Sequence, residues 1–129
     1  MSDSQVSARV VYPESDGEPM AETPIHGDVM MDTIFALRRR YADRDDVFIA
    51  GNMFFYYEEG NPRASFAPDV FVAFGVSKAK KRRVYKIWEE GRAPHFVLEV
   101  TSKKTRLEDE GNKKGLYLRL GVEEYVLFD

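Results

Sequence analysis

The segment HFVLEVT, residues 95–101, constrains the fold of this chain more than any other feature. From residue 96 to residue 100 every side chain but one is apolar, which is typical of a central β-strand covered on both faces. The exception is Glu99. An isolated carboxylate inside an apolar strand is costly unless it pairs with a base or binds a cation. The segment therefore predicts an interior strand whose acid is either half of a buried ion pair with Arg or Lys, or a metal ligand.

The hydrophobic pattern elsewhere predicts the elements around this strand. Met30, Ile34, Leu37 and Tyr41 share one face of a helix over residues 26–43. Residues 47–57 and 69–74 predict two strands that pair as an antiparallel hairpin with a longer loop. The segment 84–88 fits either a short strand or a helical turn. A helix over 105–120, stopped by Gly121, and a strand over 123–128 complete the chain.

This order of elements predicts the fold class. A helix, two paired strands, a third strand, a helix and a last strand give an α/β sandwich with a mixed sheet flanked by helices. The length of 129 residues suggests one domain. We expect residues 1–23 to be a flexible or edge-lying leader and residues 24–129 to be the folded domain.

Composition narrows the classes of function. The chain has no cysteine, so thiolate metal sites are excluded and a reducing, cytoplasmic location is favoured. No apolar run approaches the ~20 residues needed to cross a bilayer, and the N-terminus has no signal-peptide pattern. The net charge is -3, yet bases cluster in residues 38–40 and 78–83. Such runs can bind phosphate backbones, although they are more often solvated faces.

A second acid is placed to approach Glu99. Asp69 follows Pro68 directly at the start of another predicted strand, where a capping or turn role is the alternative. Two adjacent carboxylates repel each other, and Mg²⁺ or Mn²⁺ removes that cost because both ions take oxygen ligands. The backbone carbonyl of Val100 could be a third ligand. An ion held in this way can bind a phosphate oxygen and lower the pKa of an attacking water.

A polar stripe on the second predicted helix adds to this set. Thr105, Asp109, Lys113 and Tyr117 are four residues apart and so lie on one helical face. A lysine beside two carboxylates can orient water or neutralise a phosphate, and Lys113 is the candidate. The alternatives are a solvated lysine in an ion pair with Asp109, and a packing role for Tyr117. His26 could cap the first helix or reach the site.

Four segments, taken in order, carry a family resemblance. They are Pro68-Asp69-Val70, Leu98-Glu99-Val100-Thr101-Ser102, Thr105-x3-Asp109-x3-Lys113-x3-Tyr117 and Gly121-Val122-x-Glu124-Tyr125. With Pro24-Ile25-His26 and the first helix, this set resembles the Uma2 family, formerly DUF820, a bacterial family of endonucleases in the PD-(D/E)XK superfamily. The resemblance implies a restriction-endonuclease-like sandwich with an α-β-β-β-α-β core.

The resemblance also implies roles for residues. Asp69 and Glu99 would bind Mg²⁺ or Mn²⁺ and cleave nucleic acid, with DNA as the expected substrate. The superfamily usually places its lysine two residues after the second acid, where this chain has Thr101; the family moves it to the helix, which matches Lys113. Thr101, Asp109, Tyr117 and His26 would support the site. The bases expected on the nucleic-acid backbone are Lys78, Lys80, Lys81, Arg82, Arg83, Lys103 and Lys104.

Two departures from the family pattern matter. Members tend to have Ser-Pro-Ser-Thr where this chain has Ser102-Lys103-Lys104-Thr105, which adds charge and makes Lys103 an alternative lysine. Members also continue past the last strand, so we expect a truncated or short member with an exposed sheet edge, and hence a homodimer. The rival expectation is an inactive nuclease fold kept as a nucleic-acid-binding or oligomerisation module.

Overall fold

The central layer of the protein is a four-stranded mixed sheet. The computed structural model describes residues 9–14, 24–100 and 114–128. The central sheet has the strand order β1-β4-β6-β7, in which β1 and β6 run antiparallel to β4 and β7 runs parallel to β6. Its strands are β1 (Val47–Gly51), β4 (Val70–Phe74), β6 (Phe96–Val100) and β7 (Glu124–Phe128). The predicted β1–β4 hairpin and the interior place of β6 are both confirmed.

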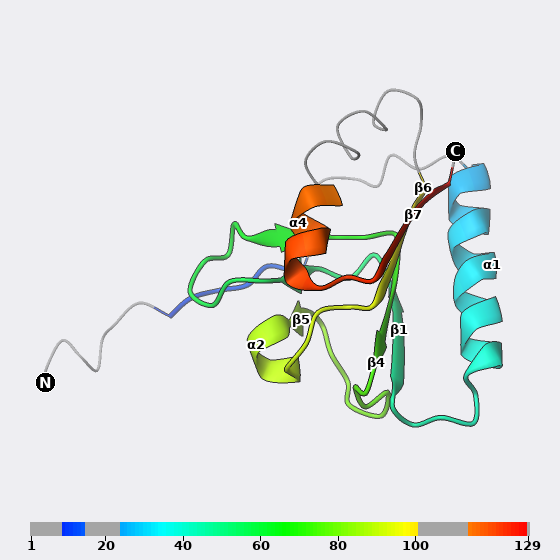
Figure 1. Ribbon diagram of the computed structural model, residues 1–129, viewed down its shortest axis with the longest axis horizontal. Coiled ribbons are helices and arrows are strands. Elements are labelled where there is room, and N and C mark those ends of the chain that lie inside the picture. The colour runs from blue at the N-terminus through cyan, green and yellow to red at the C-terminus, as the bar shows by residue number, and fades with distance from the viewer. Residues whose placement is uncertain (1–8, 15–23, 101–113, 129) are drawn as a thin grey trace, which may run out of the picture.

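Two further layers enclose this sheet (Figure 1). Helix α1 (Pro24–Arg40) covers one face. The opposite face is covered by α4 (Lys114–Leu120) and by a small sheet of order β3-β2-β5. The small sheet consists of β3 (Ser65–Phe66), β2 (Phe55–Tyr56) and β5 (Tyr85–Lys86), and α2 (Ile87–Glu90) follows β5. In chain order α1, β1, β4, β6, α4 and β7 form the expected α-β-β-β-α-β sandwich.

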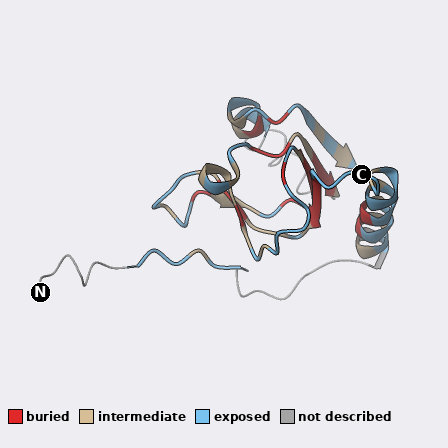
Figure 2. Cartoon of the chain, turned by 90° about the horizontal axis from the view of Figure 1, so that it is seen from below, coloured by how far each residue is buried: buried red, intermediate tan, exposed pale blue. Residues whose placement is uncertain are grey.

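Helix α1 lies on the sheet through the stripe that its sequence predicts. Met30 and Ile34 are each 5% exposed, and Leu37 and Tyr41 pack beside them. Ile34, Leu37 and Tyr41 pack against the strand side chains that point to that face, and Figure 2 shows buried residues on both the strands and the inner side of α1. The outer face of the helix is polar or exposed. The spacing of apolar residues in the sequence therefore predicted correctly which side of α1 is buried.

Alternation along the strands builds the second core on the other face. Phe48, Phe71 and Val97 point away from α1 and pack with buried aromatic rings of the small sheet and α4. The rings of Phe48 and Phe71 both contact Tyr85, with centroids 6.1 Å and 5.3 Å away. Because both faces of β4 and β6 are covered, all their residues are apolar except Glu99, as the sequence of β6 predicts.

The expected single strand over residues 47–57 is wrong. β1 ends at Gly51, Asn52 adopts a left-handed conformation with φ 54°, and the chain then enters β2 of the small sheet. Asparagine tolerates this backbone region better than most residues. The alternating pattern concealed the break because apolar residues continue on both sides of it. The two-residue strand β3 was also not predicted. The segment 84–88 was expected to be either a short strand or a helical turn, and it contains both: strand β5 and the start of α2.

Part of the predicted leader contacts the small sheet. The ring of Tyr12 lies 5.1 Å from that of Tyr56 and 5.4 Å from that of Trp88. The hydroxyl of Tyr56 donates a 2.5 Å hydrogen bond to the carbonyl of Pro13. Residues 9–14 therefore lie along the edge of the domain, while the division of the chain at residue 23 stays a prediction.

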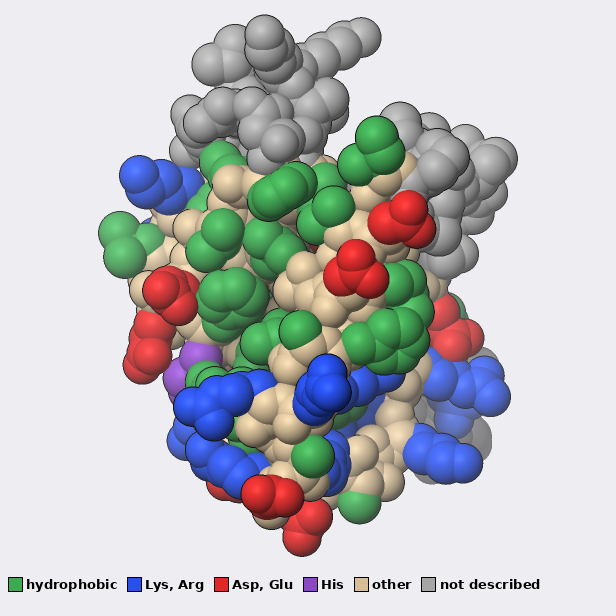
Figure 3. Space-filling view, turned by 90° about the vertical axis from the view of Figure 1, so that its right-hand side faces the viewer, with side chains coloured by type: hydrophobic (Ala, Val, Ile, Leu, Met, Phe, Trp, Pro, Cys, Tyr) green, Lys and Arg blue, Asp and Glu red, His purple; other side chains and the backbone are tan. Residues whose placement is uncertain are grey.

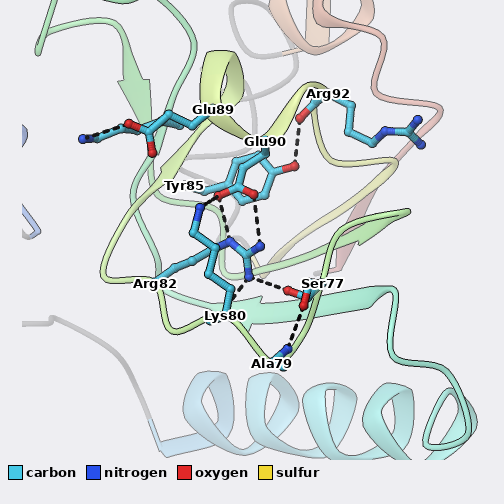
Figure 4. A network of polar contacts seen from close by, with 9 residues as sticks. Ser77, Ala79, Lys80, Arg82, Tyr85, Glu89, Glu90 and Arg92 are labelled. Carbon is cyan, nitrogen blue, oxygen red and sulfur yellow. Dashed lines mark hydrogen bonds and ion pairs between the residues drawn. The ribbon is translucent and has the colours of Figure 1, made fainter.

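A buried ion pair shapes the basic segment between β4 and β5 (Figure 4). Arg82 donates from Nε and Nη2 to the two carboxylate oxygens of Glu90, at 2.8 Å and 3.0 Å. The Arg82 and Glu90 side chains are 2% and 8% exposed. Arg82 also donates to the carbonyls of Ser77 and Lys80. These bonds hold the segment against α2, so Arg82 has a structural role.

Gly51 provides a test of the packing between α1 and the sheet. A Cβ at this position would collide with Ile34 Cδ1 and lie 3.3 Å from the carbonyl oxygen of Asp69. We predict that Gly51→Val lowers the free energy of unfolding by about 1–3 kcal/mol, as overpacking does. The matched control is Gly115→Ala in α4, where a Cβ meets open space; it should raise stability by about 0.5–1 kcal/mol. Urea unfolding measures both, and equal stability of wild type and Gly51→Val would contradict the packing.

The ion pair predicts a pH dependence of stability. The hydrogen bonds that Arg82 donates to Glu90 hold the pKa of the Glu90 carboxyl below its ordinary value of 4.5. Because the folded-state pKa is lowered, the stabilisation is complete above the unfolded-state pKa and is lost as pH falls through the folded-state pKa. Glu90→Gln should therefore be less stable than wild type at neutral pH, and the gap should narrow near ~pH 3. A gap of constant size in urea titrations at the two pH values would refute this role.

Candidate active site

Asp69 and Glu99 lie on neighbouring strands at the same end of the central sheet. Asp69 immediately precedes β4, and Glu99 is the fourth residue of β6. The register pairs Val70 with Leu98 and, continued by one residue, sets Asp69 opposite Glu99. Alternation places both acids on the face covered by α4. Asp69 is 8% exposed and Glu99 5% exposed, and among the described acids only these two are buried over the whole residue.

Each carboxylate is fixed by a hydrogen bond. The backbone N–H of Val100 donates to Asp69 Oδ2 at 2.6 Å, which ties the start of β4 to the end of β6. The hydroxyl of Tyr117, on α4, donates to Glu99 Oε1 at 3.4 Å. Hydrogen bonds to a carboxylate stabilise its charged form. The fold thus directs two acids to one buried position and restricts their orientation there.

Tyr117 is held rigidly by its aromatic neighbours. It is 1% exposed, and its ring centroid lies 4.8 Å from that of Phe66 and 4.9 Å from that of Tyr125. Both the packing role and the hydrogen-bonded hydroxyl expected for Tyr117 are therefore present. The hydroxyl reaches Glu99 from α4, which ends just before Gly121 (φ 90°), ahead of β7.

The end of β1 closes the site on the other side of Asp69. The backbone N–H of Asn52 donates to the carbonyl of Asp69 at 3.2 Å. Gly51, which has no side chain, allows the Asp69 carbonyl and Ile34 to approach the end of β1. The left-handed turn at Asn52 therefore lies beside one of the acids. Strained backbone of this kind is frequent at functional sites, and the sequence pattern did not indicate it.

Several predicted site residues lie outside the described residues: Thr101, Lys103, Lys104, Asp109 and Lys113. His26 falls in the first turn of α1, but its side chain is not described. Val100 is adjacent to both acids, and its N–H has the role already given. The assignment of its carbonyl to a metal remains a prediction.

The donor set suits a hard divalent cation. Two buried carboxylates lie on the same face, and Asp69 Oδ2 and Glu99 Oε1 each accept a hydrogen bond there. Oxygen ligands are those that Mg²⁺ and Mn²⁺ prefer. Within the described residues no group of three or more His, Asp or Glu side chains could hold a metal. A complete ligand set therefore needs backbone carbonyls, water or residues beyond those described.

The basic run over residues 78–83 lies at the far end of β4 from the acids. Five residues of extended chain separate Asp69 from Phe74, which is roughly 17 Å, and the run begins just beyond. Lys80 lies 3.3 Å from Glu90, whose carboxylate also binds Arg82. Lys78 donates to the carbonyl of Ala42. Lys81 and Arg83 are exposed, and Arg83 lies 3.7 Å from Glu14.

Lys and Arg side chains are also concentrated at this end of the sheet, on the face covered by α1. Figure 3 looks onto α1 and shows Lys and Arg side chains at its lower end, where the helix terminates in Arg38, Arg39 and Arg40. Cations in a last helical turn complement the helix dipole, and Arg38 also donates to the carbonyl of Ile49 at 3.3 Å. This basic surface is on the opposite face of the sheet from Asp69 and Glu99.

A hollow next to the acids was not predicted from the sequence. It lies between α4 and β7 and measures about 620 Å³. The register places Leu127 beside Glu99, and Tyr125 beside Val97, on the face of the acids. The described residues that line it are Lys114, Tyr117, Leu118, Val122, Glu123, Tyr125 and Leu127. The alternation of β7 indicated which residues share the face of Glu99, but the depth of the hollow depends on where α4 crosses.

Known proteins agree with this architecture. A family model, Uma2, described as "Putative restriction endonuclease", matches residues 6–129. The crystal structure of "a putative nuclease belonging to DUF820" from Anabaena variabilis ATCC 29413 superposes with a TM-score of 0.61 and 12% sequence identity, covering 96% of this chain and 71% of that chain. At this identity the likeness shows the fold. No curated protein matches the chain.

The described helices include none that is both long and apolar enough to span a membrane. The resemblance found in the ordered motifs is confirmed by the family model, and the sandwich predicted from the order of elements is confirmed by the solved structure. The chain, with its nuclease fold, therefore belongs to the Uma2 family.

Proposed function

We propose that this protein is a metal-dependent endonuclease that hydrolyses phosphodiester bonds of DNA. The observation that carries the proposal is the pair of buried acids, Asp69 and Glu99, set opposite each other on one face of the sheet. Burying two carboxylates together is unfavourable unless a cation neutralises them. Membership of a family described as restriction endonucleases supports DNA as the substrate.

In this proposal Asp69, Glu99 and the carbonyl of Val100 hold Mg²⁺ or Mn²⁺. The bound ion would supply Lewis-acid stabilisation of the phosphate and a lowered pKa of the attacking water. Val100 N–H and the Tyr117 hydroxyl keep the two carboxylates in the orientation described above. Lys113 positions the water or the scissile phosphate, while Thr101, Asp109 and His26 support the site.

Exposed Lys and Arg side chains are the residues that we expect to contact the nucleic-acid backbone. Lys103 and Lys104 are near the acids in sequence and would bind the backbone close to the cleaved bond. Lys78, Lys81 and Arg83 are exposed and would contact phosphates farther away. The Arg82 guanidinium is buried against Glu90 and Lys80 shares the same carboxylate, so we assign these two to shaping the loop.

The same proposal includes a homodimer in the bacterial cytoplasm, where DNA is present. β7 is an outer strand of the central sheet, and Val126 and Phe128 on it are 38% and 47% exposed. Apolar side chains on an outer strand favour pairing with another chain.

The alternative function is a catalytically inactive nuclease fold that binds nucleic acid or oligomerises. The observation in its favour is that no third His, Asp or Glu joins the two acids within residues 24–100 and 114–128. A module of this kind would bind nucleic acid without requiring metal.

Catalysis gives the first test of the site. We predict that Asp69→Asn and Glu99→Gln each lower Mg²⁺-dependent DNA nicking by about a hundredfold or more, because each removes a charged ligand. Asp45→Asn changes an exposed acid in a turn and should leave nicking unchanged. Supercoiled plasmid relaxation with and without Mg²⁺ measures all four proteins. Equal nicking by wild type and Asp69→Asn, or no nicking of any nucleic acid by folded wild type, would reject the proposed activity.

Metal binding gives a test that needs no turnover. Calorimetry should show saturable binding of Mn²⁺ to wild type and its loss in Asp69→Asn. At a free Mn²⁺ concentration one hundred times Kd, binding should stabilise wild type by about 2.7 kcal/mol. Asn keeps an oxygen that can accept from the Val100 N–H but removes a charged ligand, so the stability that Asp69→Asn loses relative to wild type should be larger in saturating Mn²⁺ than without metal. Loss of stability in this variant without metal, with unchanged Mn²⁺ binding, would show that Asp69 is a structural acid.

A further inference from the structure

Two residues that line the hollow between α4 and β7, Tyr117 and Leu127, are also neighbours of Glu99 in the proposed metal site. Parallel pairing sets Leu127 next to Glu99 across neighbouring strands, and Tyr117 both lines the hollow and donates to Glu99. Neighbouring strands are about 4.8 Å apart. A group attached to a phosphate held at Asp69 and Glu99 would therefore pass Leu127 or Tyr117 to enter the hollow.

The size and lining of the hollow suit one nucleotide. Its volume of about 620 Å³ is within the range of small-molecule sites. The lining combines apolar and aromatic side chains, Leu118 and Val122 on one side and Tyr125 and Leu127 on the other, with the charged Lys114 and Glu123. Aromatic and apolar walls favour the stacking of a base.

The two ends of the hollow carry side chains of opposite charge. Lys114 begins α4, and the helix runs from the end of the sheet that carries Glu99 toward the end where β7 starts. Lys114 is thus at the end of the hollow on the side of Glu99, whereas Glu123 lies at the other end, where its N–H donates to the carbonyl of His95. A cation near the metal site suits a phosphate. A carboxylate at the other end suits the amino groups of a base.

From this polarity we infer that the α4–β7 hollow is a subsite for the nucleotide next to the scissile phosphate. The phosphate faces Lys114, and the base lies between Tyr125 and the α4 wall and points toward Glu123. The inference rests on the proposed function for its place in catalysis, since the substrate must be a nucleic acid. It adds that the protein contacts a base beside the cleaved bond, and it assigns Lys114 to substrate binding.

The test uses mononucleotides with the whole protein in EDTA, so that neither metal nor cleavage contributes. Deoxycytidine 5′-monophosphate and inorganic phosphate are titrated into ¹⁵N-labelled protein and followed by NMR. We expect saturable shifts of the Tyr125 and Leu127 amides with the nucleotide, and binding at least about fivefold weaker with inorganic phosphate, which lacks the base.

Two variants on the same helix provide a matched comparison. Lys114→Glu should weaken nucleotide binding by about tenfold, because it replaces the cation that faces the phosphate. Arg119→Glu makes the same change of charge at an exposed residue of α4 outside the lining and should bind like wild type. Tyr125→Leu should remove the preference for the nucleotide over inorganic phosphate, with thermal unfolding used to confirm that the variant is folded.

Equal effects of Lys114→Glu and Arg119→Glu, equal binding of nucleotide and phosphate, or shifts confined to other parts of the protein would overturn the subsite. These outcomes are separate from failure of the proposed nuclease. A protein that binds the nucleotide in the hollow but does not nick DNA retains the subsite and loses the activity. A protein that nicks DNA with Mg²⁺ while showing one of the overturning results retains the activity and loses the subsite.

Discussion

The hydrogen bond from the Val100 amide to Asp69 is the contact on which the candidate site depends. It is 2.6 Å long and joins the start of β4 to the end of β6. Without it, the buried Asp69 carboxylate would lose a backbone donor from β6. A buried carboxylate needs such donors because water no longer solvates it. The bond keeps Asp69 opposite Glu99 and so creates the concentration of negative charge that a divalent cation would neutralise.

The layers of the fold give that pair its surroundings. α1 covers one face of the sheet and leaves the other to α4, the small sheet and their aromatic rings. Asp69 and Glu99 point to the aromatic face, where Tyr117 is packed between Phe66 and Tyr125. One face therefore provides stability through apolar packing, while one end of the other face carries polar groups, a hollow and the proposed chemistry. Sites of this kind depend on a rigid scaffold that holds unfavourable groups in place.

Much of the fold could be predicted from the sequence because its signals are local and periodic. The α1 stripe, the apolar run of β6 and the glycine stop at Gly121 each follow from spacing or backbone freedom. The left-handed turn at Asn52 could not be predicted, since apolar alternation continues through it, and β3 is too short to show a period. For the site, the isolated Glu99 in an apolar strand was informative. The partner of Arg82 and the α4–β7 hollow depend on tertiary packing, which spacing does not encode.

The central claim is that Asp69 and Glu99 hold a divalent cation in a nuclease fold. Anomalous diffraction from crystals grown with Mn²⁺ tests it most directly, because manganese is located independently of the protein atoms. The account predicts an anomalous peak about 2.0–2.4 Å from a carboxylate oxygen of both acids. A map without a peak at these acids in Mn²⁺-saturated crystals, with a lysine or arginine side chain bridging the two carboxylates instead, would contradict it and identify the pair as part of a structural ion network.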